Sequence, residues 1–189
     1  MDPDIESRLL ARAGTGDRAS FEELTRAYFP RAFGIASVIL YDREEALDAT
    51  QEAFLRAWAS VSRFRPGAPF FPWLYRILRN VCLRSIEKRG RGRALSIHEE
   101  EDRPAIAVPD GRRGPAEEAA SGELRQLFWE AYRELPPNDR EILSLRHFAD
   151  LPYAQIASVL EIPIGTVMSR LFHARRRLRE RLDPFLGEG

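Results

Sequence analysis

The sequence predicts an all-α protein: two small helical domains joined by a flexible linker, the C-terminal one a helix-turn-helix. Apolar residues recur at the three- and four-residue spacing of amphipathic helices, and the alternating pattern of β-strands is nearly absent. A stretch rich in glycine, proline and charge interrupts this pattern at residues 90–122. Two short helical segments separated by a turn at Pro163 then occupy residues 151–181.

The interruption predicts domains at residues 1–89 and 123–189. A connection of that length without secondary structure is unusual inside one compact domain, so it favours two separate domains. Because each domain is short, each is expected to have one small hydrophobic core.

The helices of the N-terminal domain are bounded by local signals. A short helix at residues 5–13 ends at a Gly-Thr-Gly sequence, and Asp17 is the predicted N-cap of the next helix. Pro30 is expected to end or bend that second helix, because proline lacks the amide hydrogen that a helix interior uses. Asp42, with Glu45 three residues later, predicts a capping box at the next helix start.

A helix, a loop and a helix complete this domain at residues 43–61, 62–71 and 72–88. Pro72 is tolerated at a first helical position. The last helix has a core-facing stripe at helical spacing, formed by Leu74, Ile77, Leu78 and Val81.

The C-terminal domain is predicted to begin with a helix near residue 123. Its core-facing stripe is expected to comprise Leu124, Leu127, Phe128 and Ala131. Asn138 or Asp139 is the expected N-cap of the following helix, at residues 140–148.

Composition limits the possible classes of protein. The 29 basic and 29 acidic side chains balance, which argues against a protein that coats DNA through net charge but allows local basic surfaces. Cys82 is the single cysteine, so an intrachain disulfide is excluded and a reducing compartment fits. With no secretory signal and no apolar stretch long enough for a bilayer, we expect a cytoplasmic protein without membrane insertion.

Cofactor and metal signatures are missing from the sequence. No cysteine or histidine pair has metal-ligand spacing, and no glycine-rich phosphate loop occurs. We therefore expect no metal, no cofactor and no catalytic residue.

The last predicted helix has a side suited to duplex DNA. Val167 and Leu171 are expected to pack on the preceding helix, and six arginines between residues 170 and 181 face one acid, Glu180. Arginine and serine can contact base edges or phosphates in the major groove. The DNA-contacting residues are predicted to be Thr166, Met168, Ser169, Arg170, Phe172, His173, Arg175 and Arg176. The alternative is a solvated helix whose arginines favour the helix dipole.

Two further groups of residues indicate binding surfaces. Aromatic residues interleave with arginines over residues 64–88, a pattern that suits single-stranded nucleic acid because unpaired bases stack on rings. The alternative is that these aromatics form the core. Asp48, Gln51 and Glu52 share one helix face, which is either a protein-docking surface or a solvated side.

Three segments resemble the sigma-70 family of bacterial transcription initiation factors, and within it the extracytoplasmic-function (ECF) group. Residues 48–54 read DATQEAF, similar to the D-x-x-Q-E-A-F segment of that group. Residues 71–80 read FPWLYRILRN, similar to its W-L-Y-R-I-x-x-N segment. Residues 165–171 read GTVMSRL, similar to its G-T-V-x-S-R signature. The resemblance covers residues 5–88 and 123–182.

The resemblance implies a factor that binds core RNA polymerase, recognises −35 and −10 promoter elements and promotes DNA melting. It implies that Asp48, Gln51, Glu52 and Phe54 bind the polymerase, facing the clamp helices of the largest subunit. It implies a −10 DNA-binding set of Arg56, Phe64, Arg65, Phe70, Trp73, Arg76, Arg79 and Asn80, with the 62–71 loop capturing a flipped base. The helix-turn-helix would bind the −35 element and the polymerase flap, and the linker would enter the polymerase cleft.

The same resemblance implies a stress-response regulator held inactive by an anti-sigma factor. Pro66, Pro69 and Pro72 make the loop stiffer than is usual in the family, and Met168 and His173 stand where many relatives have arginine.

Two other functions compete with this interpretation. A polymerase-independent helix-turn-helix regulator accounts for residues 151–181 alone. A nucleic-acid enzyme would need clustered carboxylates, and the one acidic cluster, at residues 99–102, falls in the predicted linker.

Overall fold

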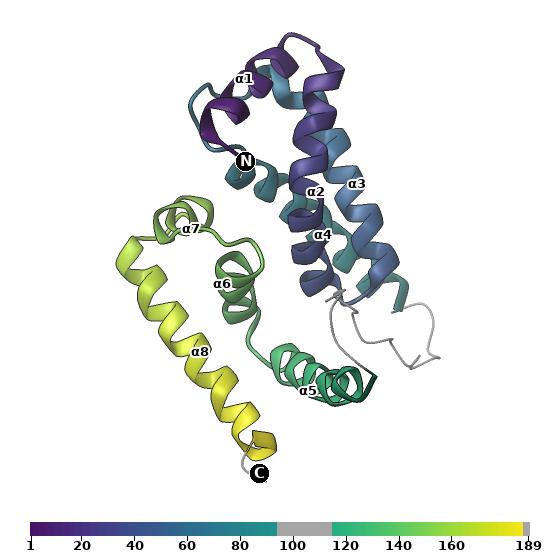
Figure 1. Ribbon diagram of the computed structural model, residues 1–189, viewed down its shortest axis with the longest axis vertical. Coiled ribbons are helices and arrows are strands. Elements are labelled where there is room, and N and C mark those ends of the chain that lie inside the picture. Colours follow the sequence, from purple (N-terminus) through teal and green to yellow (C-terminus); the bar gives the residue numbers. More distant parts are fainter. Residues whose placement is uncertain (94–114, 187–189) are drawn as a thin grey trace. The chain divides into compact units, whose positions relative to one another are not determined.

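The computed structural model describes residues 1–93 and 115–186, and these residues form helices and no β-strand. The chain divides into two compact units, Met1–Asp102 and Arg103–Gly189, here called the N-terminal and C-terminal units (Figure 1). The predicted all-α fold is therefore confirmed. Residues 94–114, including the acidic cluster at 99–102, lie outside the described residues.

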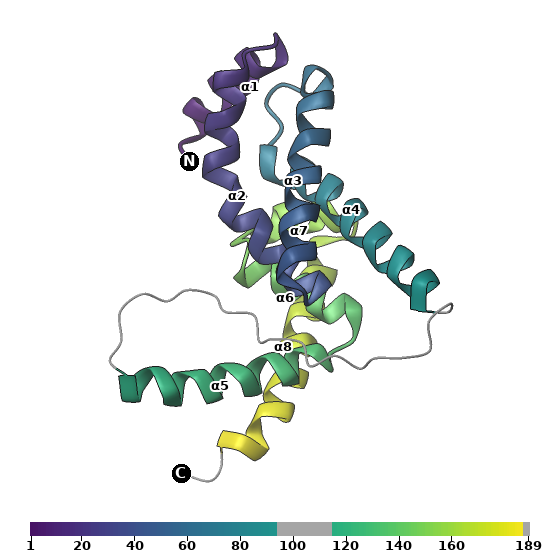
Figure 2. The ribbon, with the colours of Figure 1, turned by 90° about the vertical axis from the view of Figure 1, so that its right-hand side faces the viewer.

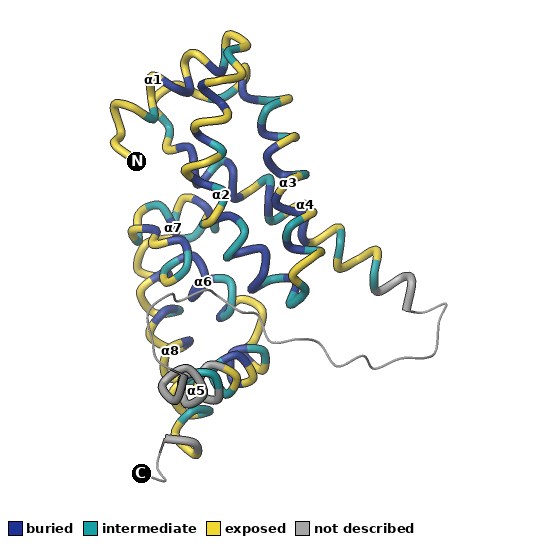
Figure 3. Tube along the Cα trace, turned by 45° about the vertical axis from the view of Figure 1, so that its right-hand side comes forward, coloured by how far each residue is buried: buried dark blue, intermediate teal, exposed yellow. Residues whose placement is uncertain are grey.

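The N-terminal unit is built on three helices packed together. Its elements are α1 (Pro3–Gly14), α2 (Arg18–Leu40), α3 (Arg43–Ser60), the 3₁₀ turn η1 (Val61–Arg63) and α4 (Phe70–Arg93). Helices α2, α3 and α4 contact one another, and α1 packs on α2 and η1. Ala46, Ala53 and Ala57 are fully buried, so small side chains let α3 approach its neighbours closely. Figure 3 shows the buried residues on the facing sides of these helices.

The predicted N-caps of α2 and α3 are confirmed, but the capping box is only half formed. The Asp17 carboxylate accepts from the Ala19 amide at 3.1 Å, and the Asp42 carboxylate accepts from the Glu45 amide at 2.8 Å. The Glu45 side chain does not return to residue 42. It pairs with Arg89 of α4 at 3.3 Å, because the charged partner on the neighbouring helix is within reach.

Helix α2 runs through Pro30, which the sequence predicted would end or bend it. Pro30 is exposed, whereas Tyr28, Ala32 and Ile35 on either side of it are buried. Burial of one continuous apolar face therefore outweighs the lost helical hydrogen bond.

Helix α4 begins at Phe70, after the loop of residues 64–69 that follows η1. A side chain from a distant helix caps its first residue. The Glu6 carboxylate of α1 accepts from the Phe70 amide at 3.0 Å and from the Tyr28 hydroxyl. Burial raises the pKa of Tyr28 above its ordinary value, and the bond to Glu6 adds to the effect. Pro72 lies in the first turn, where its missing amide hydrogen has no helical partner to lose.

The C-terminal unit packs its last helix against three others. Its elements are α5 (Pro115–Arg133), α6 (Pro137–His147), α7 (Tyr153–Leu160) and α8 (Ile164–Leu186). Helix α8 contacts α5, α6 and α7, and Figure 2 shows α5 crossing α8. A short turn joins α7 to α8 (Figure 1). Both helices that flank the predicted linker are longer than predicted. Helix α4 extends into it to Arg93, and α5 begins within it at Pro115.

The predicted core stripe of α5 is wrong at Leu124, which is 51% exposed, and right at Ala131, which is buried. Leu127 and Phe128 are half-buried, and the larger rings of Trp129 and Tyr132 supply most of the buried apolar area. The predicted cap of the next helix is wrong. Helix α6 has Pro136 at its N-cap without a side-chain hydrogen bond, so neither Asn138 nor Asp139 caps it. Asp139 is buried and accepts instead from Arg177 of α8.

Cys82 is fully buried, and burial raises the pKa of its thiol to about 12. None of the helices in the described part of the chain is long and apolar enough to cross a membrane. Within residues 1–93 and 115–186, no group of three or more histidine, cysteine and acidic side chains is arranged to hold a metal ion.

The Asp139–Arg177 pair predicts a stability effect. Arg177→Ala leaves the Asp139 carboxylate buried without its partner, and we expect the free energy of unfolding of the C-terminal unit to fall by about 2 kcal/mol. The loss is smaller than for a fully buried pair because the Arg177 side chain is 43% exposed. Hydrogen exchange of α6 amides measures this loss. Arg176→Ala is the control, since its surface pair with Glu180 should contribute under about 0.5 kcal/mol. Equal losses in the two variants would contradict the prediction.

Candidate functional surfaces

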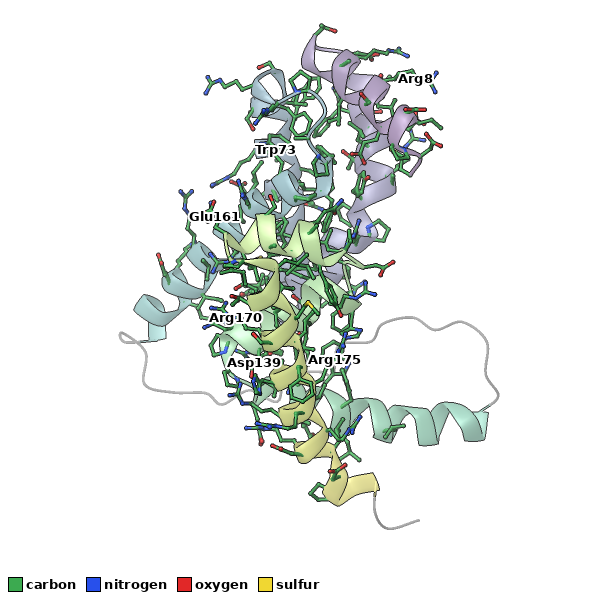
Figure 4. The ribbon with its side chains drawn as sticks, turned by 90° about the vertical axis from the view of Figure 1, so that its left-hand side faces the viewer. Arg8, Trp73, Asp139, Glu161, Arg170 and Arg175 are labelled. Carbon is green, nitrogen blue, oxygen red and sulfur yellow. The ribbon has the colours of Figure 1, made fainter. Side chains whose placement is uncertain are left out.

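The two faces of α8 differ as the sequence predicted. Val167, Leu171 and Ala174 are at most 1% exposed and face the unit's core. Met168 and Phe172 are 57% and 63% exposed on the other side. Ser169, His173, Arg175 and Arg176 are also exposed, and Thr166 and Arg170 are half-buried. Figure 4 shows Arg170 and Arg175 along this helix.

The basic stripe of α8 is narrower than its arginine count suggests. Arg177 pairs with Asp139, Arg181 with Glu134 at 3.4 Å, and Arg176 with Glu180 at 3.4 Å. The first two pairs tie α8 to α6 and to the end of α5, so those arginines contribute mainly to packing within the unit.

His147, which the sequence did not mark, contacts the outward face of α8. The Arg175 Nε donates to His147 Nε2 at 3.4 Å. Partial burial lowers the pKa of His147, and the charges of Arg175 and Arg146 add to this, which favours the neutral acceptor form. The two residues are 28 positions apart in the sequence, too far for a sequence pattern to reveal this contact.

The loop before α4 is a tight turn that presents aromatic side chains. The Ala68 amide donates to the Arg65 carbonyl at 3.2 Å, and Gly67 has φ 77°, so Pro66 and Gly67 occupy the central positions of a type II turn. Phe64, before the turn, meets the Trp73 ring edge-on at 5.1 Å. Both rings are half-buried and keep part of their surface in solvent.

Phe70 does not belong to the exposed part of this cluster, contrary to the sequence expectation. It is 0% exposed and packs on Phe64 at 6.2 Å and on Trp73 at 5.7 Å. Because α4 begins two residues earlier than predicted, Phe70 turns into the core beside Tyr28. Its ring supports the two outer aromatics and is not a stacking surface itself.

Basic and polar side chains surround the outer aromatics. Trp73, Arg76 and Asn80 are spaced i, i+3 and i+7 and share one face of α4, with Arg76 and Asn80 exposed. Arg65 is exposed on the turn, and Arg79 is half-buried. Arg56 lies on α3, where its Nε donates to Glu52 at 2.6 Å.

The polar face of α3 carries an exposed leucine and not the predicted phenylalanine. Asp48 and Gln51 are exposed and Glu52 is half-buried. Phe54 is 5% exposed and stacks on Phe29 at 5.9 Å, so it serves the core. Leu55 is 66% exposed. Its spacing of four from Gln51 and three from Glu52 puts it on the same face, a signal that the sequence did contain.

Models of two protein families match successive parts of the chain. "Sigma-70 region 2" matches residues 24–92, and "Sigma-70, region 4" matches residues 125–178. The first match runs from within α2 through α3 and the turn to the end of α4. The second runs from within α5 through α6 and α7 into α8.

Curated relatives match over nearly the whole chain. The RNA polymerase sigma-H factor of Pseudomonas aeruginosa is 32% identical over 192 residues, covering 100% of this chain and 99% of its own length. The ECF RNA polymerase sigma-E factor of Escherichia coli K12 is 30% identical and covers 94% of each chain. That of Haemophilus influenzae is 29% identical, over 96% of this chain and 97% of its own.

Two solved structures are similar to most of the chain. The sigma factor RpoE of Bartonella quintana, solved in complex with the anti-sigma factor NepR, has a TM-score of 0.70 at 27% identity, over 86% of this chain and 96% of that one. CnrH, solved with the cytosolic domain of CnrY, has a TM-score of 0.72 at 23% identity, over 96% and 99%, and supports the fold alone. The chain is a member of the sigma-70 family of RNA polymerase sigma factors, in the extracytoplasmic-function group.

Proposed function

We propose that this chain carries core RNA polymerase to promoters by binding a −35 element as duplex and one strand of a −10 element after melting. The observation that carries the proposal is the pair of surfaces on one chain: a basic outward face on α8, and half-buried aromatics beside arginines at the start of α4 (Figure 4). Duplex reading and strand capture need these different chemistries. The polymerase performs the reaction, and this chain contributes no catalytic group.

The proposed −35 surface is the outward side of α8. It comprises Thr166, Met168, Ser169, Arg170, Phe172, His173, Arg175 and Arg176. The bond from Arg175 to neutral His147 supports it, because a side chain held in one orientation loses less entropy when it binds DNA.

The proposed −10 surface is the turn before α4 and the adjoining face of that helix. It comprises Arg56, Phe64, Arg65, Trp73, Arg76, Arg79 and Asn80. Phe70 is left out as a contact, because its ring is covered on all sides. The stiff Pro66–Gly67 turn next to two half-buried rings favours capture of a base that has left the stack.

The proposed polymerase surface is the outer face of α3, directed at the clamp helices of the largest subunit. It comprises Asp48, Gln51, Glu52 and Leu55, with Leu55 in place of Phe54. An apolar side chain ringed by polar ones is the usual composition of a binding surface. We also propose that the C-terminal unit binds the polymerase flap. A protein with this role acts in the cytoplasm, where bacterial DNA lies.

A dedicated anti-sigma protein is the proposed inhibitor. The related RpoE of Bartonella quintana was solved in complex with such a partner, the anti-sigma factor NepR. A pull-down from the native cell that returns polymerase but no inhibitor would contradict this part. We also propose that residues 1–89 and 123–189 are the two sigma domains, that residues 90–122 enter the polymerase cleft, and that the chain acts in a stress response.

In vitro transcription from a promoter library randomised at both elements tests the proposal. With core polymerase and the chain, we expect defined starts and two enriched sequence blocks. A polymerase-independent regulator would instead bind one duplex site without polymerase and would start no transcript.

Leu55 is 66% exposed in the free chain, and the polymerase would bury it in the proposed complex. Leu55→Ala is therefore expected to weaken binding to core polymerase about tenfold, because most of that apolar side chain is removed. Affinity measured by fluorescence anisotropy checks this. Ile5→Ala, which removes a 40% exposed side chain of α1, is the matched control and should bind as wild type. An unchanged affinity for Leu55→Ala would place the polymerase contact elsewhere.

Arg175→Ala and Trp73→Ala should affect different steps. We expect Arg175→Ala to weaken closed-complex binding. The slope of log affinity against log salt concentration should fall by about one, the loss of one phosphate contact. Trp73→Ala should leave closed-complex binding intact and weaken opening by about 1–3 kcal/mol, as measured by permanganate reactivity of melted thymines. Trp73→Phe is the control and should keep most of the opening. Equal damage to closed-complex binding by both alanine variants would refute the assignment.

A further inference from the structure

Among its described side chains, helix α8 leaves three bulky apolar ones largely in solvent: Ile164, its first residue, which is 51% exposed, and the pair Met168 and Phe172. Met168 and Phe172 are 57% and 63% exposed, while Val167 and Leu171 of the same helix are at most 1% exposed. Met168 and Phe172 are four residues apart, so they lie one above the other on the outward face. Single exposed apolar residues are ordinary, but this pair stands next to Ser169 and Arg176 on the proposed −35 surface.

The charge around the pair favours a polyanion as its partner. No acidic residue occurs between Ile164 and Arg179, and the outward face carries Arg175 and Arg176 beside the pair. A protein docking surface with two apolar side chains would gain nothing from so strong a positive bias unless its partner were acidic. Duplex DNA supplies both the negative charge and, on its base edges in the major groove, one apolar group: the C5 methyl of thymine.

We propose that Met168 and Phe172 read thymine methyl groups in the −35 duplex. The proposal rests on the proposed function, because it requires the outward face of α8 to enter the major groove. Arginine and serine beside the pair then contact phosphates or polar base edges, and the two apolar side chains select thymine at the positions they face. A methyl group removed from water by one of these side chains is expected to raise affinity about fourfold.

Deoxyuridine tests the proposal because it lacks only that methyl group. The probes are promoter duplexes selected from a library randomised over the −35 region, using the full chain bound to core polymerase. Each enriched thymine, on either strand, is replaced singly by deoxyuridine, and affinity is measured by competition. We expect about fourfold weaker binding at one or two positions. Phe172→Ala should bind thymine and deoxyuridine equally at one of them, and Met168→Ala at the other.

Control variants separate this effect from damage to the fold. Both side chains are exposed and alanine favours helices, so circular dichroism should be unchanged in either variant. Leu124→Ala removes an apolar side chain of α5 that is 51% exposed in the same unit, and it should keep full discrimination between the two bases.

Each contrary result has one meaning. A defined −35 element without enriched thymine, or with equal affinity for thymine and deoxyuridine in the wild type, overturns this inference and leaves the proposed function standing. Discrimination that survives in both alanine variants also overturns it. If the two variants lose binding to an inhibitor protein and keep base discrimination, the pair is a protein contact. If no −35 block is enriched at all, the proposed function itself fails.

Discussion

The N-terminal unit depends on where α4 begins, and a carboxylate from another helix fixes that point. Glu6 of α1 accepts from the Phe70 amide at 3.0 Å and holds the Tyr28 hydroxyl. Phe70 is consequently fully buried, and its ring supports Phe64 and Trp73 from inside. A proline- and glycine-fixed turn joins these rings. The candidate strand-binding surface is thus rigid because its inner layer is part of the hydrophobic core.

In the C-terminal unit, α8 contributes to the hydrophobic core on one side and to the candidate DNA surface on the other. Val167, Leu171 and Ala174 supply the core side. Arg177 and Arg181 tie the flank of α8 to Asp139 and Glu134, so part of its positive charge is neutralised within the unit. The remaining outward face combines cationic, polar and apolar side chains. These complement the phosphates, the polar base edges and the thymine methyl groups of duplex DNA.

The balanced charge of the chain is consistent with a division of binding between surfaces. A chain with zero formal net charge has little general attraction for DNA, so affinity has to come from local surfaces. Two small units, each with a modest contact area, bind weakly when separate. Held on one polymerase, each would raise the effective concentration of the other at its promoter element.

Helical periodicity, the Asp17 and Asp42 caps, the helix-turn-helix and the two-faced last helix follow from the sequence alone, because each is a pattern of residues that are neighbours along the chain. Leu55 was also within reach of this reasoning, since it shares a helix face with Gln51. Contacts between distant segments had to come from the tertiary structure. Continuous burial carries α2 through Pro30, Glu6 sets the first residue of α4, and the Asp139–Arg177 pair replaces an expected helix cap. Phe54 and Phe70 are buried for the same reason: packing against remote helices decides whether an aromatic ring is core or surface.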